Sequence, residues 1–494
     1  MSPILILSII AIYFAVLFVI GKVTSKGADN NSFFIGNKQS PWWIVAFGMI
    51  GTSLSGVTFI SVPGWVASSQ FSYMQMVFGY LVGYTVIATV LMPLYYRLNL
   101  TSIYTYLHDR FGIASYKTGA SFFLLSRTIG AAFRLYLVAG VMQLTIFDAW
   151  GVPFIVTVIA TILFIWLYTY QGGIKTIIWT DTLQTLFMLL AVVFTVVIIS
   201  NNLGLEFGEI INTIGDSDYS KVFFFEDVNH PKYFWKQFIA GALISIVMTG
   251  LDQDMMQKNL SCKNIGEAQK NMFSFSIVLV LVNLFFLSLG ALLYLFATAK
   301  GMELPAKADD LYPIIATGGE LPIVVGILFI LGLIAAAYSS ADSALAALTT
   351  SACVDILDIE KKPKSEQTGL RKKVHILMSA ILVLTIMVFH WIGNDSVISQ
   401  VFKFAGYTYG PLLGLYTFGM MTELNVRDKL VPVICLASPA LTFIINTNSE
   451  YLLGGYKFGF ELLALNGLIT FIGLLLISTK KKSIDQRPNG LICP

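Results

Sequence analysis

The sequence predicts an all-α polytopic membrane protein, because composition and hydropathy patterning point to the same fold. Hydrophobic residues make up 56% of the 494 residues and charged residues only 12%, too few charges to cover a soluble protein of this length. Apolar runs of about 18 or more residues recur along the chain, and each can cross a bilayer as a helix. The polar stretches between them are too short for an independent soluble domain.

Thirteen membrane spans are predicted from these apolar runs. The first run has neither a basic start nor a small-residue cleavage site, so we interpret it as a retained helix rather than a signal peptide. The spans cover approximately residues 2–23, 40–66, 73–98, 118–147, 152–170, 176–200, 235–257, 271–299, 321–353, 373–393, 399–421, 430–447 and 461–478.

The distribution of basic residues predicts the orientation of the spans. With the N-terminus outside, 22 of the 31 lysine and arginine residues fall in inner loops, six fall in outer loops and three lie within spans. Lys258 is among those assigned to an inner loop. Because lysine and arginine are enriched in cytoplasmic loops, we expect a multi-pass protein of the plasma (inner) membrane, with N-out and C-in topology.

The chain shows no pattern typical of an enzyme. The four cysteines have no paired spacing and the four histidines are scattered, so we expect no catalytic residues, disulfides or cofactor. We also expect no nucleic-acid partner. The largest outer loop, residues 201–233, is interpreted as a solvated connector in preference to a lid.

The second span carries a polar interruption near its middle. Two glycines and four serine or threonine residues lie about eleven residues from its inner end, or about 16 Å into the membrane. A segment that unwinds there would release backbone carbonyls for a cation and amide groups for a solute, as the broken helices of inverted-repeat transporters do. The alternative is an ordinary kinked helix.

A second interruption follows five spans later. Ser245, Thr249 and Gly250 precede the polar string Asp252-Gln253-Asp254 in the span at residues 235–257. An inverted five-plus-five repeat places its second broken helix at this position, so the two matching breaks predict that architecture.

The span at residues 321–353 carries a row of small and hydroxyl residues. Ala336, Ser339, Ser340 and Ser343 fall on one helical face at i, i+3, i+4 and i+7. Such a face suits a hard monovalent cation such as sodium. The alternative is a small-residue seam that lets two helices pack closely.

Several charged residues lie within predicted spans, where a charge needs a cavity or a partner. Arg127 and Arg134 share a helical face at i and i+7, Asp181 lies in the inner half of the sixth span, and Asp342 flanks the serine face. Structural ion pairs of Arg134 with Asp342, or of Arg127 with Asp181, are the alternative to a functional site.

With these features assembled, residues 1–425 resemble the sodium/solute symporter family of sodium-coupled proline, sugar, sialate and vitamin carriers. The resemblance rests on four segments in the family's order. They are residues 172–181 (GGIKTIIWTD), 252–258 (DQDMMQK), 336–340 (AAYSS) and 409–415 (YGPLLGL).

The resemblance implies a leucine-transporter-type fold, with a ten-helix core of two inverted repeats, one preceding helix and two following helices. The corresponding segments are an extra helix at 1–25, the first repeat at 38–203, an outer loop at 204–233, the second repeat at 234–422, two peripheral helices at 428–479 and a cytoplasmic tail at 480–494. We expect the protein to function as a monomer in the bilayer.

The resemblance also implies where sodium, the coupling ion, binds. The main site would use backbone carbonyls of Gly51, Leu54 and Ala336 with the side chains of Ser339 and Ser340. Some family members hold a second sodium deeper inside, and here Asp181, Asp342 and Ser343 would form that second sodium or coupling site. Asp342 departs from the small or hydroxyl residue usual at its position. It either strengthens this cation site or forms an ion pair with Arg134.

The same comparison implies a site for a small polar solute. Its candidate residues are Ser53, Ser55, Thr58, Gln75, Arg134, Ser245, Met248 and Thr249. Sugar carriers place aromatic residues where this chain has Met248 and Thr249, whereas the three hydroxyl residues resemble the set with which sialate carriers hold a carboxylate. A carboxylate-bearing solute such as an amino acid, sialate or monocarboxylate is therefore favoured.

The expected function is sodium-driven solute import by alternating access. The alternatives are a sodium/sugar or polyol symporter and a proton-coupled permease that uses Asp181 or Asp342. A membrane-embedded enzyme or sensor is the least favoured, since no titratable groups cluster at one depth and no long soluble region follows the last span.

Overall fold

The structure, a computed structural model, describes residues 3–24, 40–100, 102–392 and 397–479 and is almost entirely helical. The tail expected at residues 480–494 lies outside the described residues. The first half contains α1 (Pro3–Thr24), α3 (Trp42–Ser53), α4 (Gly56–Ser69), α5 (Tyr73–Val86), η2 (Ile87–Leu91), α6 (Met92–Arg97), α7 (Thr105–Arg110), α8 (Ile113–Met142), η3 (Gln143–Phe147), η4 (Asp148–Trp150), α9 (Phe154–Asn202) and α10 (Phe207–Gly215).

The second half of the chain begins at residue 234. It contains α11 (Phe234–Ser245), η5 (Ile246–Gly250), α12 (Gln253–Leu260), α13 (Ile265–Ala299), η6 (Ala308–Asp310), α14 (Leu311–Thr317), α15 (Ile323–Ser351), η7 (Ala352–Ile356), η8 (Ile359–Lys361), α16 (Lys364–Ile392), α17 (Val397–Thr408), α18 (Gly410–Met421), η9 (Asp428–Leu430), α19 (Val431–Thr447), α20 (Ser449–Leu452) and α21 (Leu462–Leu476). The strands β1 (Asn425–Val426) and β2 (Ser478–Thr479) pair antiparallel.

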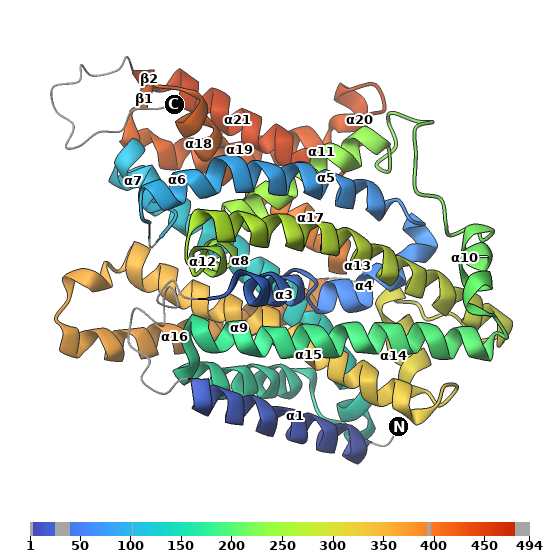
Figure 1. The fold of residues 1–494 in the computed structure, drawn as a ribbon. Helices are drawn as coiled ribbons and strands as arrows, with labels where there is room; N and C mark the ends of the chain where they lie inside the picture. The colour runs from blue at the N-terminus through green and yellow to red at the C-terminus, as the bar shows by residue number, and fades with distance from the viewer. Residues whose placement is uncertain (1–2, 25–39, 101, 393–396, 480–494) are drawn as a thin grey trace.

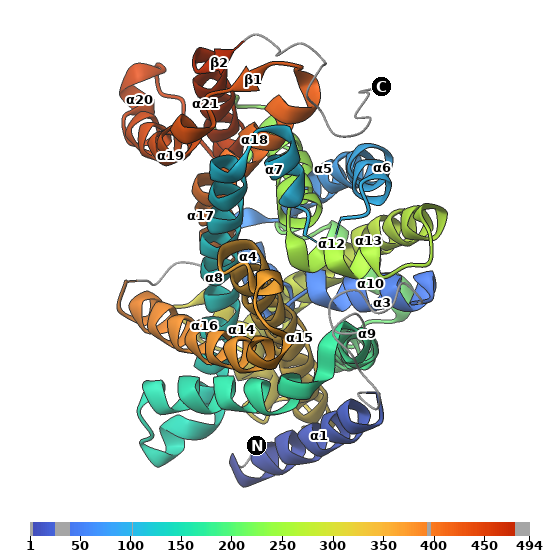
Figure 2. The same ribbon diagram turned by 90° about the vertical axis from the view of Figure 1, so that its left-hand side faces the viewer.

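The helices run roughly along one common direction, as expected for a bundle that crosses a membrane (Figure 1). The two views agree that α1 lies at one end of the bundle and α19, α20 and α21 at the other (Figures 1 and 2). Between them, α3 packs against α9, and α15 packs against both α8 and α9. The two short segments α10 and α14 lie on one side of the bundle, whereas α7 and the β1–β2 pair lie on the opposite side (Figure 1).

The prediction of a helical multi-pass membrane protein is confirmed. Within the described residues, seven helices are long and apolar enough to cross a membrane, and the count reaches nine when each bent pair is one span. The helix α1, the first part of α9 and α21 contain shorter apolar stretches. The count of 13 spans and the N-out orientation stay predictions.

The structure differs from the expected spans in one region. A loop was predicted between spans at residues 152–170 and 176–200, but the backbone stays helical throughout α9. The side chains of residues 167–176, including the start of the 172–181 motif, lie outside the described part of the structure.

The outer segment between α9 and α11 is largely exposed, and hydrogen bonds tie it to the neighbouring helix ends. Gln75, at the start of α5, accepts a hydrogen bond from the Phe224 amide at 3.1 Å and donates one to the Lys232 carbonyl at 2.9 Å. The Phe71 amide donates to the Lys221 carbonyl at 3.1 Å. These bonds hold the segment against the end of α4 and the start of α5.

Candidate functional site

The first predicted helix break is confirmed between α3 and α4, which are bent by 52°. The last turn of a helix leaves its carbonyl groups without intrahelical partners, so the end of α3 offers backbone oxygens at the break. Two glycines bring α3 close to α9. A Cβ on Gly48 would lie 3.3 Å from the Asp181 Cβ, and one on Gly51 would overlap the Thr185 hydroxyl.

The second predicted break is also confirmed, with α11–η5 and α12 bent by 66°. The carbonyls of Gly250 and Leu251 at the break accept hydrogen bonds from the hydroxyls of Tyr95 and Tyr104, each at 2.9 Å. Asp252 caps α12 by accepting from the Asp254 amide at 3.0 Å. The break is therefore held open by side-chain partners.

Arg127 pairs with the aspartates of the second break and not with Asp181, its partner in one of the two alternative ion pairs. Its guanidinium lies 3.6 Å from the Asp252 carboxylate and hydrogen bonds to the Asp254 carboxylate. Arg127 and both aspartates are buried. Tyr409 donates to the other side of this cluster, 3.0 Å from Asp252 Oδ2. The cluster joins α8 to α12, so that expected pair is wrong because the register of α8 sets Arg127 opposite α12.

Asp181 pairs with Lys258, which the sequence assigned to an inner loop. Lys258 is only 1% exposed, and its ammonium donates to Asp181 Oδ2 at 2.7 Å, to the Thr52 hydroxyl at 2.6 Å and to the Ser343 hydroxyl at 2.8 Å. Thr52 also donates to Asp181 at 3.0 Å. The loop assignment of Lys258 is therefore wrong: α12 turns inward at the break and buries it between α3, α9 and α15.

The hydroxyl face of α15 lies against this cluster and the first break. Ser339 donates to Asp181 Oδ1 at 2.6 Å, and Ser340 donates to the Ala336 carbonyl at 3.0 Å. A Cβ on Gly56, the first residue of α4, would lie 4.0 Å from the Ala337 backbone. The face therefore meets the end of α3 and the start of α4, where the carbonyls of Gly51 and Leu54 are.

Asp342 is fully buried beside this face and does not pair with Arg134 in the structure. Its carboxylate accepts a hydrogen bond from the Ser343 amide at 2.5 Å. The alternative of an Arg134–Asp342 ion pair is therefore wrong, since no such pair occurs within the described residues.

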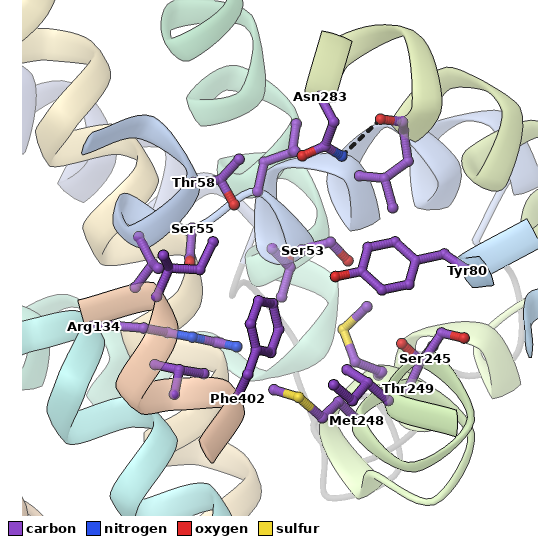
Figure 3. Close-up of a pocket in the computed structure, with 18 of the residues that line it drawn as sticks. Ser53, Ser55, Thr58, Tyr80, Arg134, Ser245, Met248, Thr249, Asn283 and Phe402 are labelled. Atoms are coloured by element: carbon purple, nitrogen blue, oxygen red, sulfur yellow. Dashed lines mark hydrogen bonds between the residues drawn. The ribbon is translucent and has the colours of Figure 1, made fainter. Parts of the chain in front are cut away.

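A pocket opens between the two breaks, and seven of the eight predicted solute residues line it. These are Ser53, Ser55, Thr58, Arg134, Ser245, Met248 and Thr249. In Figure 3, Arg134 points toward Phe402 near the middle of the pocket, with the three hydroxyl residues of the first break on one side and Met248 and Thr249 on another.

Gln75 does not line the pocket, because its side-chain amide is hydrogen-bonded to the backbone of the outer segment. The sequence reasoning missed other lining residues, including Tyr73, Tyr80, Tyr84 and Asn283. The three tyrosines fall at i, i+7 and i+11 of one helix, a spacing that would have placed them on one face.

Among the described residues, Arg134 differs from Arg127 in having no carboxylate within ion-pair distance. No ion pair of Arg134 occurs within the described residues, and its Nε has no hydrogen-bond partner there. Its side chain is half-buried and lines the pocket. A guanidinium with free donors in a pocket is suited to a carboxylate, which it can bind through two parallel hydrogen bonds.

Comparisons with known proteins agree with this arrangement. Residues 33–425 match the model of the sodium:solute symporter family. The chain is 25% identical over 441 residues to a sodium/sialic acid symporter of Aliivibrio fischeri, covering 84% of this chain and 82% of that protein. It is 24% identical over 442 residues to a sodium/sialic acid symporter of Proteus mirabilis, covering 85% and 86%.

The fold is similar to that of a solved transporter. The structure of a Na⁺-coupled sialic acid symporter in a substrate-bound, outward-open state matches with a TM-score of 0.80 and 21% identity, covering 96% of this chain and 99% of that chain. The likeness supports the overall helical arrangement of a membrane transporter.

Proposed function

Since the chain belongs to the sodium:solute symporter family and is a sodium-coupled symporter, we propose that it imports a small organic solute that carries a carboxylate. The observation that carries the proposal is Arg134, a pocket-lining guanidinium without an ion pair in the described part of the chain. A charge held in a low-dielectric site is costly unless it is paired, so an anionic group on the solute would compensate it.

The other pocket residues fit a solute with a polar head and a larger body. Ser53, Ser55 and Thr58 lie at the first break, where their hydroxyls and the adjacent backbone amides can donate to carboxylate oxygens. The body of the solute would contact the aromatic and thioether side chains of the opposite wall, such as Tyr80, Met248 and Phe402. Both reported relatives are named for an acid, which supports the same solute class.

We propose that sodium binds beside this pocket. Its ligands are the carbonyls of Gly51, Leu54 and Ala336 and the hydroxyls of Ser339 and Ser340. The support is geometric: the hydroxyl face of α15 meets the first break, and oxygen ligands suit a hard cation. Because sodium would join α3 to α15, it would favour the conformation in which the pocket is complete, which is the basis of coupling.

The energy for import follows from the ion. A sodium ion that moves into a cell with a negative interior gains about 2.3 kcal/mol per 100 mV from the membrane potential alone. At a tenfold change per 1.4 kcal/mol, one ion supports about 50-fold accumulation of a solute with no net charge, such as an amino acid, before the sodium concentration gradient is added. For a solute with one net negative charge, the potential acts oppositely on the solute and on the ion, so the sodium concentration gradient supplies the energy.

The proposed topology has 13 spans in two inverted five-helix repeats at residues 38–203 and 234–422, with N-out and C-in orientation, acting as a monomer in the plasma membrane. It is supported by the two broken helices, five spans apart in the predicted order. It is also supported by the basic residues, 22 of 31 of which were assigned to one side, although Lys258 is now removed from that set.

A thermal-shift screen of the purified protein tests the proposal. The solutes are sugars, amino acids, sialic acids and monocarboxylates, each measured in sodium and in choline buffer. A ligand at 100 times its dissociation constant stabilises the native state by about 2.7 kcal/mol, which is readily detected. We expect a shift only with a carboxylate-bearing solute in sodium. A shift with neutral sugars alone, or one that is equal in choline, would contradict the proposal.

A further inference from the structure

Lys258 is an ammonium group sealed inside the transport core. It lies on α12, immediately beyond the second break, and is 1% exposed. An ammonium has three donors, and all three are used: on Thr52 of α3, Asp181 of α9 and Ser343 of α15, at 2.6, 2.7 and 2.8 Å. Oxygens from three separate helices thus converge on one positive charge.

These oxygens are of the kind that a sodium ion takes. One carboxylate and two hydroxyls form a hard oxygen set, and Asp181 and Ser343 are two of the three residues expected to hold a second sodium. Hydrogen bonds of 2.6–2.8 Å place the ammonium between these oxygens, in the space the ion would need.

The positive charge of Lys258 disfavours a second cation at the Asp181 carboxylate. In the part of the chain that the structure describes, Asp181 is the one carboxylate that pairs with the ammonium, and its other oxygen already accepts a hydrogen bond from Ser339 at 2.6 Å. A sodium ion bound to the same carboxylate would lie within a few ångströms of a like charge, which strongly disfavours binding.

We infer that the Lys258 ammonium is a tethered replacement for the second cation. The deeper site is filled by the chain's own lysine, and the protein binds one sodium per transport cycle, at the hydroxyl face of α15 beside the first break. This inference rests on the proposed function for the coupling to sodium. It adds the number of ions and the residue that sets it.

The first test counts bound sodium on the purified, full-length wild-type protein by ²²Na⁺ binding without solute. One sodium per protein is the expected result. Two sodium ions would overturn the inference and leave the proposed function intact. A count of zero would instead contradict sodium coupling itself, so the two failures are distinguishable.

The second test removes the Lys258 ammonium from the deeper site. In Lys258→Met the oxygens of Asp181 and Ser343 lose their ammonium, and the sodium count should double to two. Lys258→Arg keeps a cation there and should bind one. A folded Lys258→Met variant that still binds one sodium would overturn the inference.

Two further variants control for the loss of an ammonium and for misfolding. Lys117→Met removes another ammonium that is paired with an aspartate, Asp358 at 3.0 Å, but outside the site, and should leave the count at one. If Lys258→Met does not fold, the double variant Asp181→Asn with Lys258→Met removes both charges together. It lacks the carboxylate of the deeper site and should bind one sodium, and a count of two would overturn the inference.

Discussion

Replacing Arg134 is the perturbation that separates a solute-binding role from a structural role most clearly. Arg134→Gln keeps a polar side chain in the pocket but removes the charge and the guanidinium fork. Because no ion pair of Arg134 occurs within the described residues, the change leaves no carboxylate stranded there. We therefore expect the melting temperature to stay the same or to rise slightly.

The expected loss of solute affinity follows from the contacts that a guanidinium makes. A hydrogen bond to a charged group contributes about 1.5–3 kcal/mol, so losing a paired interaction with a carboxylate costs about 3 kcal/mol. At 1.4 kcal/mol per tenfold change, the dissociation constant should rise about 100-fold. Arg134→Lys keeps the charge without the fork and should lose about tenfold.

The assay is a thermodynamic double-mutant cycle, in which one change is made in the protein and the other in the solute. The dissociation constants of the solute and of its carboxamide analogue are measured on wild type and on Arg134→Gln in saturating sodium. Wild type should prefer the carboxylate strongly, and the variant should bind both with similar affinity. Lys403→Met, which removes an exposed charge from α17, should behave as wild type. An unchanged preference in Arg134→Gln would refute the proposed role of Arg134.

Three further predictions concern sodium, the buried ion pair and pH. Ser340→Ala should raise the sodium concentration for half-maximal uptake about tenfold, for one lost ligand of about 1.4 kcal/mol, with little change in solute affinity at saturating sodium; equal effects on both would contradict the sodium site. Asp181→Asn and Lys258→Met should each destabilise the protein by about 3–5 kcal/mol, and the double variant should recover much of this in thermal unfolding, because single changes strand a buried charge; additive losses would contradict the pairing. Burial raises the pKa of Asp309, in the segment between α13 and α15, to about 6. The folded state therefore binds the proton more tightly than the unfolded state, so this carboxyl should lower stability progressively from about pH 4 to about pH 6 and no further above that. Asp309→Asn should flatten that part of the stability profile, and an unchanged slope would count against this role.

The broken helices and the hydroxyl face could be predicted because their signals are local. Glycine and hydroxyl residues at mid-span weaken helical continuity wherever they occur, and serines at i and i+4 share a face in any helix. Both bends are found where the polar interruptions lie, and the Ser339 hydroxyl donates a hydrogen bond to Asp181. Seven of the eight solute residues that the family resemblance implied line one pocket.

The ion pairs could not be predicted because they depend on how helices are set against each other. Arg127 joins Asp252 and Asp254, and Asp181 joins Lys258, through contacts between residues 77 to 127 positions apart. A lysine just past an apolar run resembles a loop lysine in any count of basic residues. Only the bend at the second break turns α12 inward and buries it.

Sodium-driven uptake into proteoliposomes tests the central claim most directly. The protein is reconstituted, and accumulation of a radiolabelled solute selected in the thermal-shift screen is followed under an inward sodium gradient, a choline control and an inward proton gradient without sodium. We expect a carboxylate-bearing solute to accumulate with the sodium gradient alone, and accumulation to be abolished or strongly reduced in Arg134→Gln. Accumulation driven by the proton gradient without sodium, or uptake that is indifferent to Arg134, would contradict it.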